Sequence, residues 1–172
     1  MPTFACCPTD ATYFTSAPER HELAVELACS PARLFEILED PDSWPHWAPG
    51  IARVEWTSPL GVGATRTVSF RGAGQIEEKF DVWEPGRLLA FHVERGSDPI
   101  FWSFAERYAI EARPGGRCQL TWTVAYTPRD RFARLHPWVR PAMRVTLKAF
   151  TLLLRRYVAR RVRAEAGATA VA

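Results

Sequence analysis

Hydrophobic and polar residues alternate along much of this chain, and an alternation with a period of two is typical of strands that are buried on one face. The first run of this kind extends from Glu22 to Cys29. Six more runs follow, separated by short turns rich in Gly and Pro, at residues 51–57, 64–71, 75–83, 88–95, 100–112 and 118–126. Turns this short join antiparallel neighbours. The pattern therefore predicts an antiparallel meander of seven strands.

Two other parts of the chain have the period of three to four residues that is typical of helices. Ser30 and Pro31 form an N-cap and first-turn pair, and we place two short helices between the first and second strands. In the last quarter of the chain, one long helix is predicted from its apolar residues Met143, Leu147, Phe150, Leu154 and Tyr157. Pro137 and Pro141 should keep its regular part from starting before about Val139.

The chain has 172 residues, which is close to the size of one ordinary domain. Residues 1–20 show no period and contain the vicinal Cys6 and Cys7, so we expect an irregular N-terminal arm. A single domain over residues 21–166 and a frayed tail over residues 167–172 account for the rest. The order of the elements predicts an α+β fold, in which a curved seven-stranded sheet wraps around the long C-terminal helix and encloses a cavity.

Composition narrows the class of protein. Hydrophobic residues make up 47% of the chain and charged residues 24%, which is ordinary for a globular protein. The four cysteines have neither a CxxC spacing nor a neighbouring histidine, so we expect no metal site, and no motif requires a cofactor. The N-terminus lacks a secretory pattern, and the apolar runs are too short to span a membrane. We therefore expect a cytoplasmic protein.

Several short motifs resemble those of a known superfamily. They are DPDSWPHWAPGI at residues 40–51, VEW at 54–56, GVGA at 61–64, EPGRL at 84–88 and GGR at 115–117. Residues 22–163 are in this way similar to the START-like, polyketide cyclase/dehydrase-type proteins of the SRPBCC superfamily. The resemblance implies a helix-grip fold, with a deep cavity for hydrophobic ligands between the sheet and the long helix. It leaves the activity open, because relatives include lipid carriers, ligand receptors, aromatase/cyclases and ubiquinone-binding proteins.

Two acidic residues are predicted to face the cavity. Within residues 100–112, Glu106 interrupts an otherwise apolar face, and in the strand 75–83 Glu78 shares a face with apolar residues. Burial raises the pKa of a carboxyl group, as a general acid or base requires. The alternative for Glu106 is a place near an opening, or a purely structural pair with an arginine.

Arg66 is the candidate partner of Glu78. We assume that the turn Gly72–Gly74 sets Arg71 opposite Gln75. Arg66 then becomes a diagonal neighbour of Glu78, and the two form an internal ion pair. A salt bridge at the rim is the alternative, because a register error of one residue would turn both side chains outward.

Aromatic residues are unusually frequent, with seven Trp and ten Phe, and large rings often line ligand pockets. Those on the predicted inner faces of the sheet are candidate ligand-binding residues, namely Trp56, Phe70, Phe80, Phe91, Trp102, Phe104, Trp122 and Tyr126. The helix contributes Met143, Leu147, Phe150 and Leu154. The alternative for any of these side chains is a place in the packed core. Trp44 and Trp47 are expected to plug one end of the cavity or to form part of its lid.

The C-terminal part of the chain is strongly basic. Residues 129–172 carry 11 basic and 2 acidic side chains, a balance of +9, whereas residues 1–128 carry 11 basic and 17 acidic ones, a balance of −6. A solvated charged face is one interpretation, attraction to an anionic membrane surface is another, and an acidic protein partner is a third. Nucleic acid is not expected as a partner, because aromatic residues are not interleaved with the cations. The oligomeric state stays open.

Three functions are compatible with these observations. The first is a non-catalytic carrier or sensor that binds a lipid, an isoprenoid or an aromatic polyketide-like molecule in the cavity. The second is a polyketide cyclase, aromatase or dehydratase, with Glu106 or Glu78 as the base, Arg66 as the group that stabilises an enolate, and Tyr108 or Tyr126 as the proton donor. The third is an interaction module that uses the basic helix.

Overall fold

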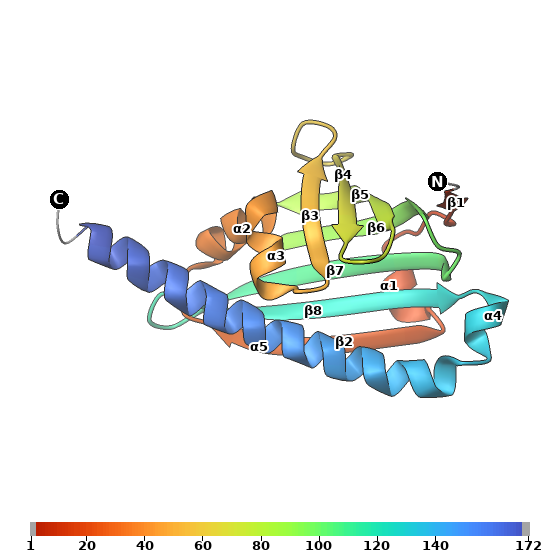
Figure 1. The fold of residues 1–172 in the computed structure, drawn as a ribbon. Helices are drawn as coiled ribbons and strands as arrows, with labels where there is room; N and C mark the ends of the chain where they lie inside the picture. Colours follow the sequence, from red (N-terminus) through yellow and green to blue (C-terminus); the bar gives the residue numbers. More distant parts are fainter. Residues whose placement is uncertain (1–2, 170–172) are drawn as a thin grey trace.

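Seven long strands form one antiparallel sheet in the order β2-β8-β7-β6-β5-β4-β3, as shown by the computed structural model, which describes residues 3–169 (Figure 1). The strands are β2 (Glu19–Leu27), β3 (Ile51–Trp56), β4 (Thr65–Phe70), β5 (Gln75–Glu84), β6 (Leu88–Gly96), β7 (Phe101–Arg113) and β8 (Arg117–Pro128). An eighth, very short strand, β1 (Phe4–Ala5), pairs with β6. The predicted meander is confirmed for β3 to β8, but the first strand β2 pairs with the last strand β8 instead of with β3.

The long helix α5 (His136–Thr169) lies across one face of the sheet, and its C-terminal end extends beyond the sheet (Figure 1). It buries Leu147, Leu154 and Val158 in the main hydrophobic core, so the predicted α+β helix-grip fold is confirmed. The helix begins three residues before the predicted start at Val139. Pro137 permits this because it lies in the first turn, where a missing N–H leaves no intrahelical hydrogen bond unmade. Pro141 lies inside the helix without ending it.

Short helical elements connect β2 to β3 and cover one end of the sheet. They are α2 (Pro31–Glu39), the 3₁₀ turn η1 (Pro41–Ser43) and α3 (Trp44–Trp47). The Ser30 hydroxyl accepts a hydrogen bond of 3.2 Å from the backbone N–H of Arg33, as an N-cap should. Asp40 and Arg161 form an ion pair of 2.7 Å, and Arg33 pairs with Glu165. These contacts hold the C-terminal half of α5 against the short helices.

The prediction of an irregular arm over residues 1–20 is wrong for much of its length. The arm contains β1 and the helix α1 (Tyr13–Ser16), and β2 begins at Glu19, before the predicted domain start. Helix α1 packs on the sheet face opposite to α5, where Phe14 contacts three small side chains, Ala90, Ala105 and Ala125. Isolated alanines do not produce a hydrophobic pattern that would reveal this packing site from the sequence.

The predicted frayed tail also differs in part. Helix α5 continues to Thr169, so residues 167–169 are helical, and residues 170–172 lie outside the described residues. A four-residue helix, α4 (Asp130–Ala133), precedes α5. Among residues 3–169, no helix combines the length and the apolar character that a membrane span needs.

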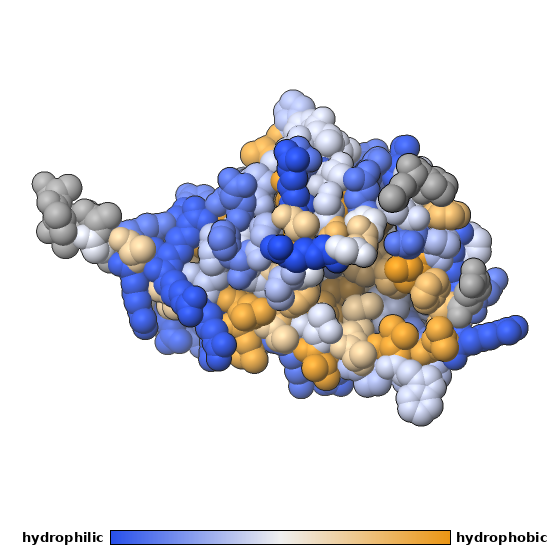
Figure 2. Space-filling view, viewed as in Figure 1, coloured by the Kyte–Doolittle hydropathy of each residue, from blue (hydrophilic) through white to orange (hydrophobic). Residues whose placement is uncertain are grey.

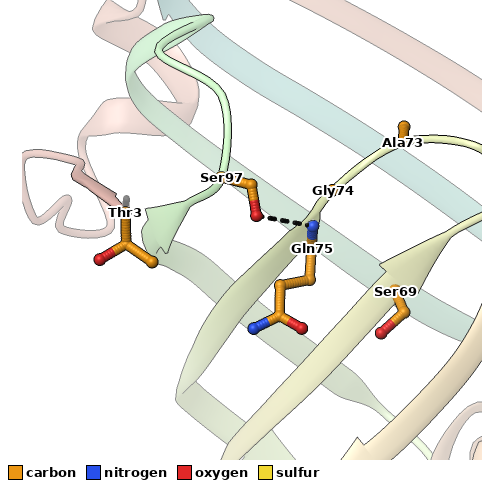
Figure 3. A pocket seen from close by; sticks show the side chains of 6 residues that line it. All are labelled: Thr3, Ser69, Ala73, Gly74, Gln75 and Ser97. Carbon is orange, nitrogen blue, oxygen red and sulfur yellow. Dashed lines mark hydrogen bonds between the residues drawn. The ribbon is translucent and has the colours of Figure 1, made fainter. Parts of the chain in front are cut away.

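The turn between β4 and β5 is tied to the turn between β6 and β7 (Figure 3). The backbone N–H of Gln75 donates to the Ser97 hydroxyl over 3.0 Å, and the Ser97 N–H donates to the Gln75 carbonyl over 2.9 Å. Gly74 permits this close approach, because a Cβ atom at that position would lie 2.3 Å from the Cβ of Ser97. The two turns are therefore linked to each other and form one rim at this end of the sheet.

Candidate functional site

A cavity of about 510 Å³ lies between the sheet and α5. In Figure 2, apolar side chains gather around a hollow between α5 and the strands above it. The wall is built by α3, β4 to β8 and the middle of α5, and the tied turns contribute Gly74 and Asp98 to its rim. The predicted ligand-binding residues that line this cavity are Phe70, Phe91, Phe104, Trp122, Met143, Leu147 and Phe150.

Three other predicted ligand-binding residues belong to the packed core instead, which was the stated alternative. Phe80 is fully buried, and its ring centroid lies 5.1 Å from that of Trp56. The indole Nε1 of Trp56 donates a 3.0 Å hydrogen bond to the carbonyl of Glu39 in α2. Leu154 is fully buried where α5 crosses the sheet. These side chains do not line the cavity and belong to the packed core beside its wall.

Trp102 lies outside the cavity, contrary to the alternation in β7. The pairing of β7 with β8 shifts between Phe101 and Ser103, which is the mark of a β-bulge. The extra residue turns Phe101 to the cavity beside Phe104 and leaves Trp102 42% exposed. Its ring instead stacks under the Arg129 guanidinium, 4.1 Å from the ring centroid. A bulge interrupts the period of two, so alternation alone misplaces this residue.

Tyr126 belongs to a separate buried network. Its hydroxyl lies 3.0 Å from Nε2 of His136 and 3.3 Å from Nε2 of His21. The Nδ1 atom of His136 lies 3.1 Å from a carboxylate oxygen of Glu19, whose other oxygen lies 3.3 Å from Arg140 Nε. Burial raises the pKa of Tyr126 to about 12. This hydroxyl is not part of the cavity wall, so it is poorly placed to donate a proton to a ligand there.

Arg66 and Glu78 form an internal ion pair, as one of the two sequence-based interpretations predicts. The assumed register is wrong by two residues, because the last pair before the turn is Ser69↔Gln75, with five residues between its members instead of three. Arg66 is therefore directly opposite Glu78, and Nε lies 2.5 Å from Oε2. Both side chains point inward, with residue exposures of 1% and 4%. Burial raises the pKa of Glu78, and the neighbouring guanidinium opposes that rise.

Aromatic rings surround the Arg66 guanidinium. Its central carbon lies 4.2, 5.0, 5.0 and 5.5 Å from the ring centroids of Trp44, Phe80, Phe91 and Trp56. The ring faces stabilise the buried cation. Its Nη1 atom nevertheless has no hydrogen-bond partner among residues 3–169, and neither does the buried indole Nε1 of Trp47. Arg66 and Trp47 both line the cavity, so each holds an unpaired N–H donor close to its wall, although neither nitrogen is itself exposed to the cavity space.

Glu106 is the second acid in the cavity. One carboxylate oxygen accepts hydrogen bonds from the Tyr108 hydroxyl and, over 3.0 Å, from Nε1 of Trp122. Burial raises the pKa of Glu106 to about 7, with the Glu78 charge adding to the rise and the two hydrogen bonds opposing it. Burial also raises the pKa of Tyr108 well above its ordinary value. Near neutral pH, Glu106 therefore populates both its protonated and its ionised form.

Four of the five residues proposed for catalysis thus lie in one place, and Tyr126 is the exception. Arg66, Glu78, Glu106 and Tyr108 all line the same cavity. Trp47 was expected only as part of a plug or lid, and its unpaired N–H is a feature that sequence patterns do not reveal. Within the part of the chain that the structure describes, no group of three or more His, Cys, Asp or Glu side chains is placed to hold a metal ion.

A curved antiparallel sheet gripping a long C-terminal helix, with an apolar cavity between them, defines a protein of the START-like helix-grip class. Residues 19–168 match the family described as "Polyketide cyclase / dehydrase and lipid transport", and the chain belongs to this family. An uncharacterised protein of Mycobacterium tuberculosis is 38% identical over 156 residues, which cover 90% of this chain and 93% of the relative.

Solved structures share the fold at low sequence identity. The Zhui aromatase/cyclase from Streptomyces sp. R1128 superposes with a TM-score of 0.72 at 18% identity, covering 86% of this chain and 97% of that one. A START superfamily protein from Mycobacterium smegmatis has a TM-score of 0.70 at 16% identity, covering 82% of this chain and 97% of that one. These likenesses confirm the fold, while the superfamily assignment rests on the family match.

Proposed function

We propose that this protein binds an apolar small molecule that carries an oxygen acceptor, such as a carbonyl group, and holds it in the cavity as a carrier or sensor. The observation that supports this most directly is the pair of unpaired N–H groups, on Arg66 and Trp47, beside a wall that is largely apolar. A buried donor without a partner costs about 1 to 3 kcal/mol, and a ligand oxygen would remove that cost.

The remaining wall supplies affinity rather than orientation. Removal of apolar ligand surface from water contributes roughly 25 cal/mol per Å², before the costs of ordering are subtracted. Phe70, Phe91, Phe104 and Phe150 offer large apolar surfaces to the cavity. Lipids, isoprenoids and aromatic polyketide-like molecules combine such an apolar body with a few oxygen atoms.

The test begins with mass spectrometry of small molecules extracted from the freshly purified protein. Binding of the neutral fluorescent probe N-phenyl-1-naphthylamine then locates the site. We expect Phe104→Gln to weaken probe binding about tenfold or more, because it places a polar group in the wall. Trp138→Gln is the control, since Trp138 is an exposed aromatic residue outside the cavity wall. Equal binding by the two variants would contradict the proposal.

A second function is favoured by the environment of Glu106. A carboxylate with a pKa near 7 beside a hydroxyl group matches a general base in a cyclase, aromatase or dehydratase acting on a poly-β-carbonyl chain. Glu106 would take a proton from a carbon between two carbonyl groups, and the free N–H of Arg66 would hold the resulting enolate oxygen. Glu106→Gln is expected to retain probe binding and to lose at least about a hundredfold in turnover of such a substrate.

We also propose that α5 brings the cavity to an anionic membrane surface. Exposed apolar side chains along α4 and α5 include Trp138 at 80%, Val145 at 67%, Leu135 at 55% and Leu152 at 51%. Exposed cations such as Arg144, Lys148, Arg155 and Arg156 lie on the same helix. Apolar side chains that enter the headgroup layer and cations that contact phosphates are the usual pair of membrane contacts.

Vesicle cosedimentation tests this partner. We expect binding to anionic but not to neutral liposomes, lost in high salt and in a variant with Arg155, Arg156 and Arg160 changed to Gln. The matched control removes the same charge from exposed residues away from α5, namely Arg53 of β3, Arg87 of the turn before β6 and Arg95 of β6. Equal recovery in the supernatant with both types of vesicle would leave the basic face as a solvated surface.

A further inference from the structure

Strands β6 and β7 separate at one end of the sheet. Their pairing ends at His92↔Ala105, although β6 stays paired with β5 as far as Gly96 and β7 stays paired with β8 as far as Phe101. The last four residues of β6 therefore have no direct partner on β7. This divergence opens a gap in the sheet beside the cavity.

The N-terminal strap, residues 4–7, fills this gap. Phe4 and Ala5 pair with Gly96 and Arg95 of β6, and the N–H of Cys6 donates to the Glu94 carbonyl over 2.8 Å. The N–H of Cys7 then crosses to β7 and donates to the Trp102 carbonyl over 2.6 Å. The strap is bonded to both separated strands, and Figure 1 shows the N-terminus beside the end of β6.

Arg129 fastens the strap from the end of β8. Its Nη2 atom donates a 2.6 Å hydrogen bond to the Ala5 carbonyl, and its Nε atom donates a 3.0 Å hydrogen bond to the Phe101 carbonyl. The same guanidinium stacks on Trp102. Groups from β6, from β7 and from the residue after β8 thus hold a segment of four residues. Chain ends are poorly ordered unless they are held in this way.

Cys6 lies between the ligand cavity and the protein surface. It lines the ligand cavity on one side and, on the other, a surface pocket of about 380 Å³ together with His92, Glu94 and Arg95. Its thiol lies 3.7 Å from the Phe101 carbonyl, and Phe101 also lines the cavity. One residue of the strap therefore separates the cavity from solvent. The family match begins at residue 19, so this wall segment lies outside the region that defines the family.

We infer that the N-terminal strap is a wall segment of the ligand site and that Cys6 determines how large a ligand the site accepts at this end. The inference rests on the proposed binding function. With the strap in place, the gap between β6 and β7 is closed and a ligand leaves only past α5. Without it, the same gap is a second exit. The side chain at position 6 takes up space that the ligand would otherwise fill.

Release of N-phenyl-1-naphthylamine, followed by stopped-flow fluorescence, tests the wall. We expect a variant lacking residues 2–7 to release the probe at least ten times faster than the full chain. Cys7→Pro removes the hydrogen bond to Trp102 and fixes φ at this position, and should release the probe several times faster, whereas Cys7→Ser should match the wild type. Far-UV circular dichroism and thermal unfolding establish that each variant is folded, and Cys7→Pro keeps the test decisive if the deletion does not fold.

Bulk at position 6 tests the size limit. We expect Cys6→Trp to weaken probe binding at least fivefold, while Cys7→Trp, at an exposed position outside the cavity wall, leaves it unchanged. Wild-type rates in the folded strap variants, together with unchanged binding by Cys6→Trp, would overturn the inference. Failure of the wild-type chain to bind any probe would instead contradict the proposed function. Acrylamide quenching of tryptophan fluorescence needs no ligand and should still rise in the deletion variant. An unchanged degree of quenching would contradict the inference that the strap is part of the cavity wall.

Discussion

Two buried polar clusters in this protein use similar residues in opposite ways. In the network at the start of α5, the hydroxyl of Tyr126 contacts both His136 and His21, and His136 in turn contacts Glu19. In the cavity, the Arg66 side chain contacts Glu78 through one nitrogen while its Nη1 atom finds no partner among residues 3–169. The first network holds three elements together. The second leaves an unpaired donor and a titrating acid beside the cavity.

The location of each cluster explains the difference. The Tyr126 network lies where the first turns of α5 meet β2 and β8, so the Tyr126 hydroxyl and His136 both find protein partners there. The Glu19 Oε2 atom has an ion pair with Arg140 but no hydrogen bond among residues 3–169. The Arg66 cluster faces a cavity of about 510 Å³, which no side chain fills. Buried polar groups normally find partners. Where they do not, and a cavity lies beside them, a ligand is the partner that completes the set.

The largest expected effect comes from breaking the ion pair in the cavity. Arg66→Met leaves the Glu78 carboxylate buried without its cation, and such a change typically costs about 3 to 5 kcal/mol of unfolding free energy. Urea unfolding at neutral pH measures this loss. Further replacement of Glu78 by Leu should recover most of it. Arg53→Met is the control, because its exposed pair with Glu55 contributes less than about 1 kcal/mol. An equal loss in both single variants would contradict this account.

Breaking the Tyr126 network should reduce stability without changing probe binding in the cavity. His136→Phe removes one partner each from Tyr126 and Glu19, and we expect a loss of about 2 kcal/mol in urea unfolding. Binding of N-phenyl-1-naphthylamine should stay within twofold of the wild type. His46→Phe is a suitable control, since a Phe ring keeps the stacking on Tyr157. Loss of probe binding in a folded His136→Phe protein would erase the distinction between the two clusters.

The cavity acid should make stability fall as pH rises. The pKa of Glu106 in the folded protein is about 7, above its ordinary value of 4.5, so the folded state keeps a proton that the unfolded chain releases. Its stabilising contribution is complete below about pH 4.5 and is lost as pH rises through 7. We expect a difference on the order of 1 kcal/mol between wild type and Glu106→Gln across this window. Parallel stability curves for the two proteins would contradict it.

The smallest expected effect is the contribution of His21 to stability, which falls as pH falls, opposite to that of Glu106. Burial, with the Arg140 charge adding to it, lowers the pKa of His21 below its ordinary value of 6.5. Its contribution is therefore present above pH 6.5 and is lost as pH falls through the lower folded value. Unfolding measured below pH 6.5 should show a shallower acid decline for His21→Gln than for the wild type, by less than the Glu106 effect. A steeper decline would show that His21 is protonated in the folded state.

Much of the sheet could be predicted because alternation is a local property of the chain. Glu106 and Glu78 were placed on the inner face by the parity of their positions alone, and both line the cavity. The helix start at Ser30 was readable for the same reason, since a cap depends on residues within one turn. Predictions of this kind hold wherever the backbone stays regular.

The prediction failed where the backbone leaves its regular period. The bulge at Phe101 to Ser103 turned Trp102 out of the site, and the five-residue turn before Gln75 moved Arg66 from a diagonal to a direct partner of Glu78. Neither the bulge nor the turn length has a local pattern that identifies it. Both depend on how two strands twist past each other in the finished sheet.

The sequence by itself therefore determined the fold class, the order of β3 to β8 and which acids face inward, because hydrophobic periodicity and turn chemistry act between near neighbours. The pairing of β2 with β8 joins distant parts of the chain and was not predicted. The tertiary structure alone decided which polar groups satisfy each other. His21, Tyr126 and His136 come from three distant segments, and so do Cys6, Glu94 and Trp102 at the strap. Whether a buried N–H group finds an acceptor depends on everything packed around it in three dimensions. The spacing of residues along the chain does not reveal this packing.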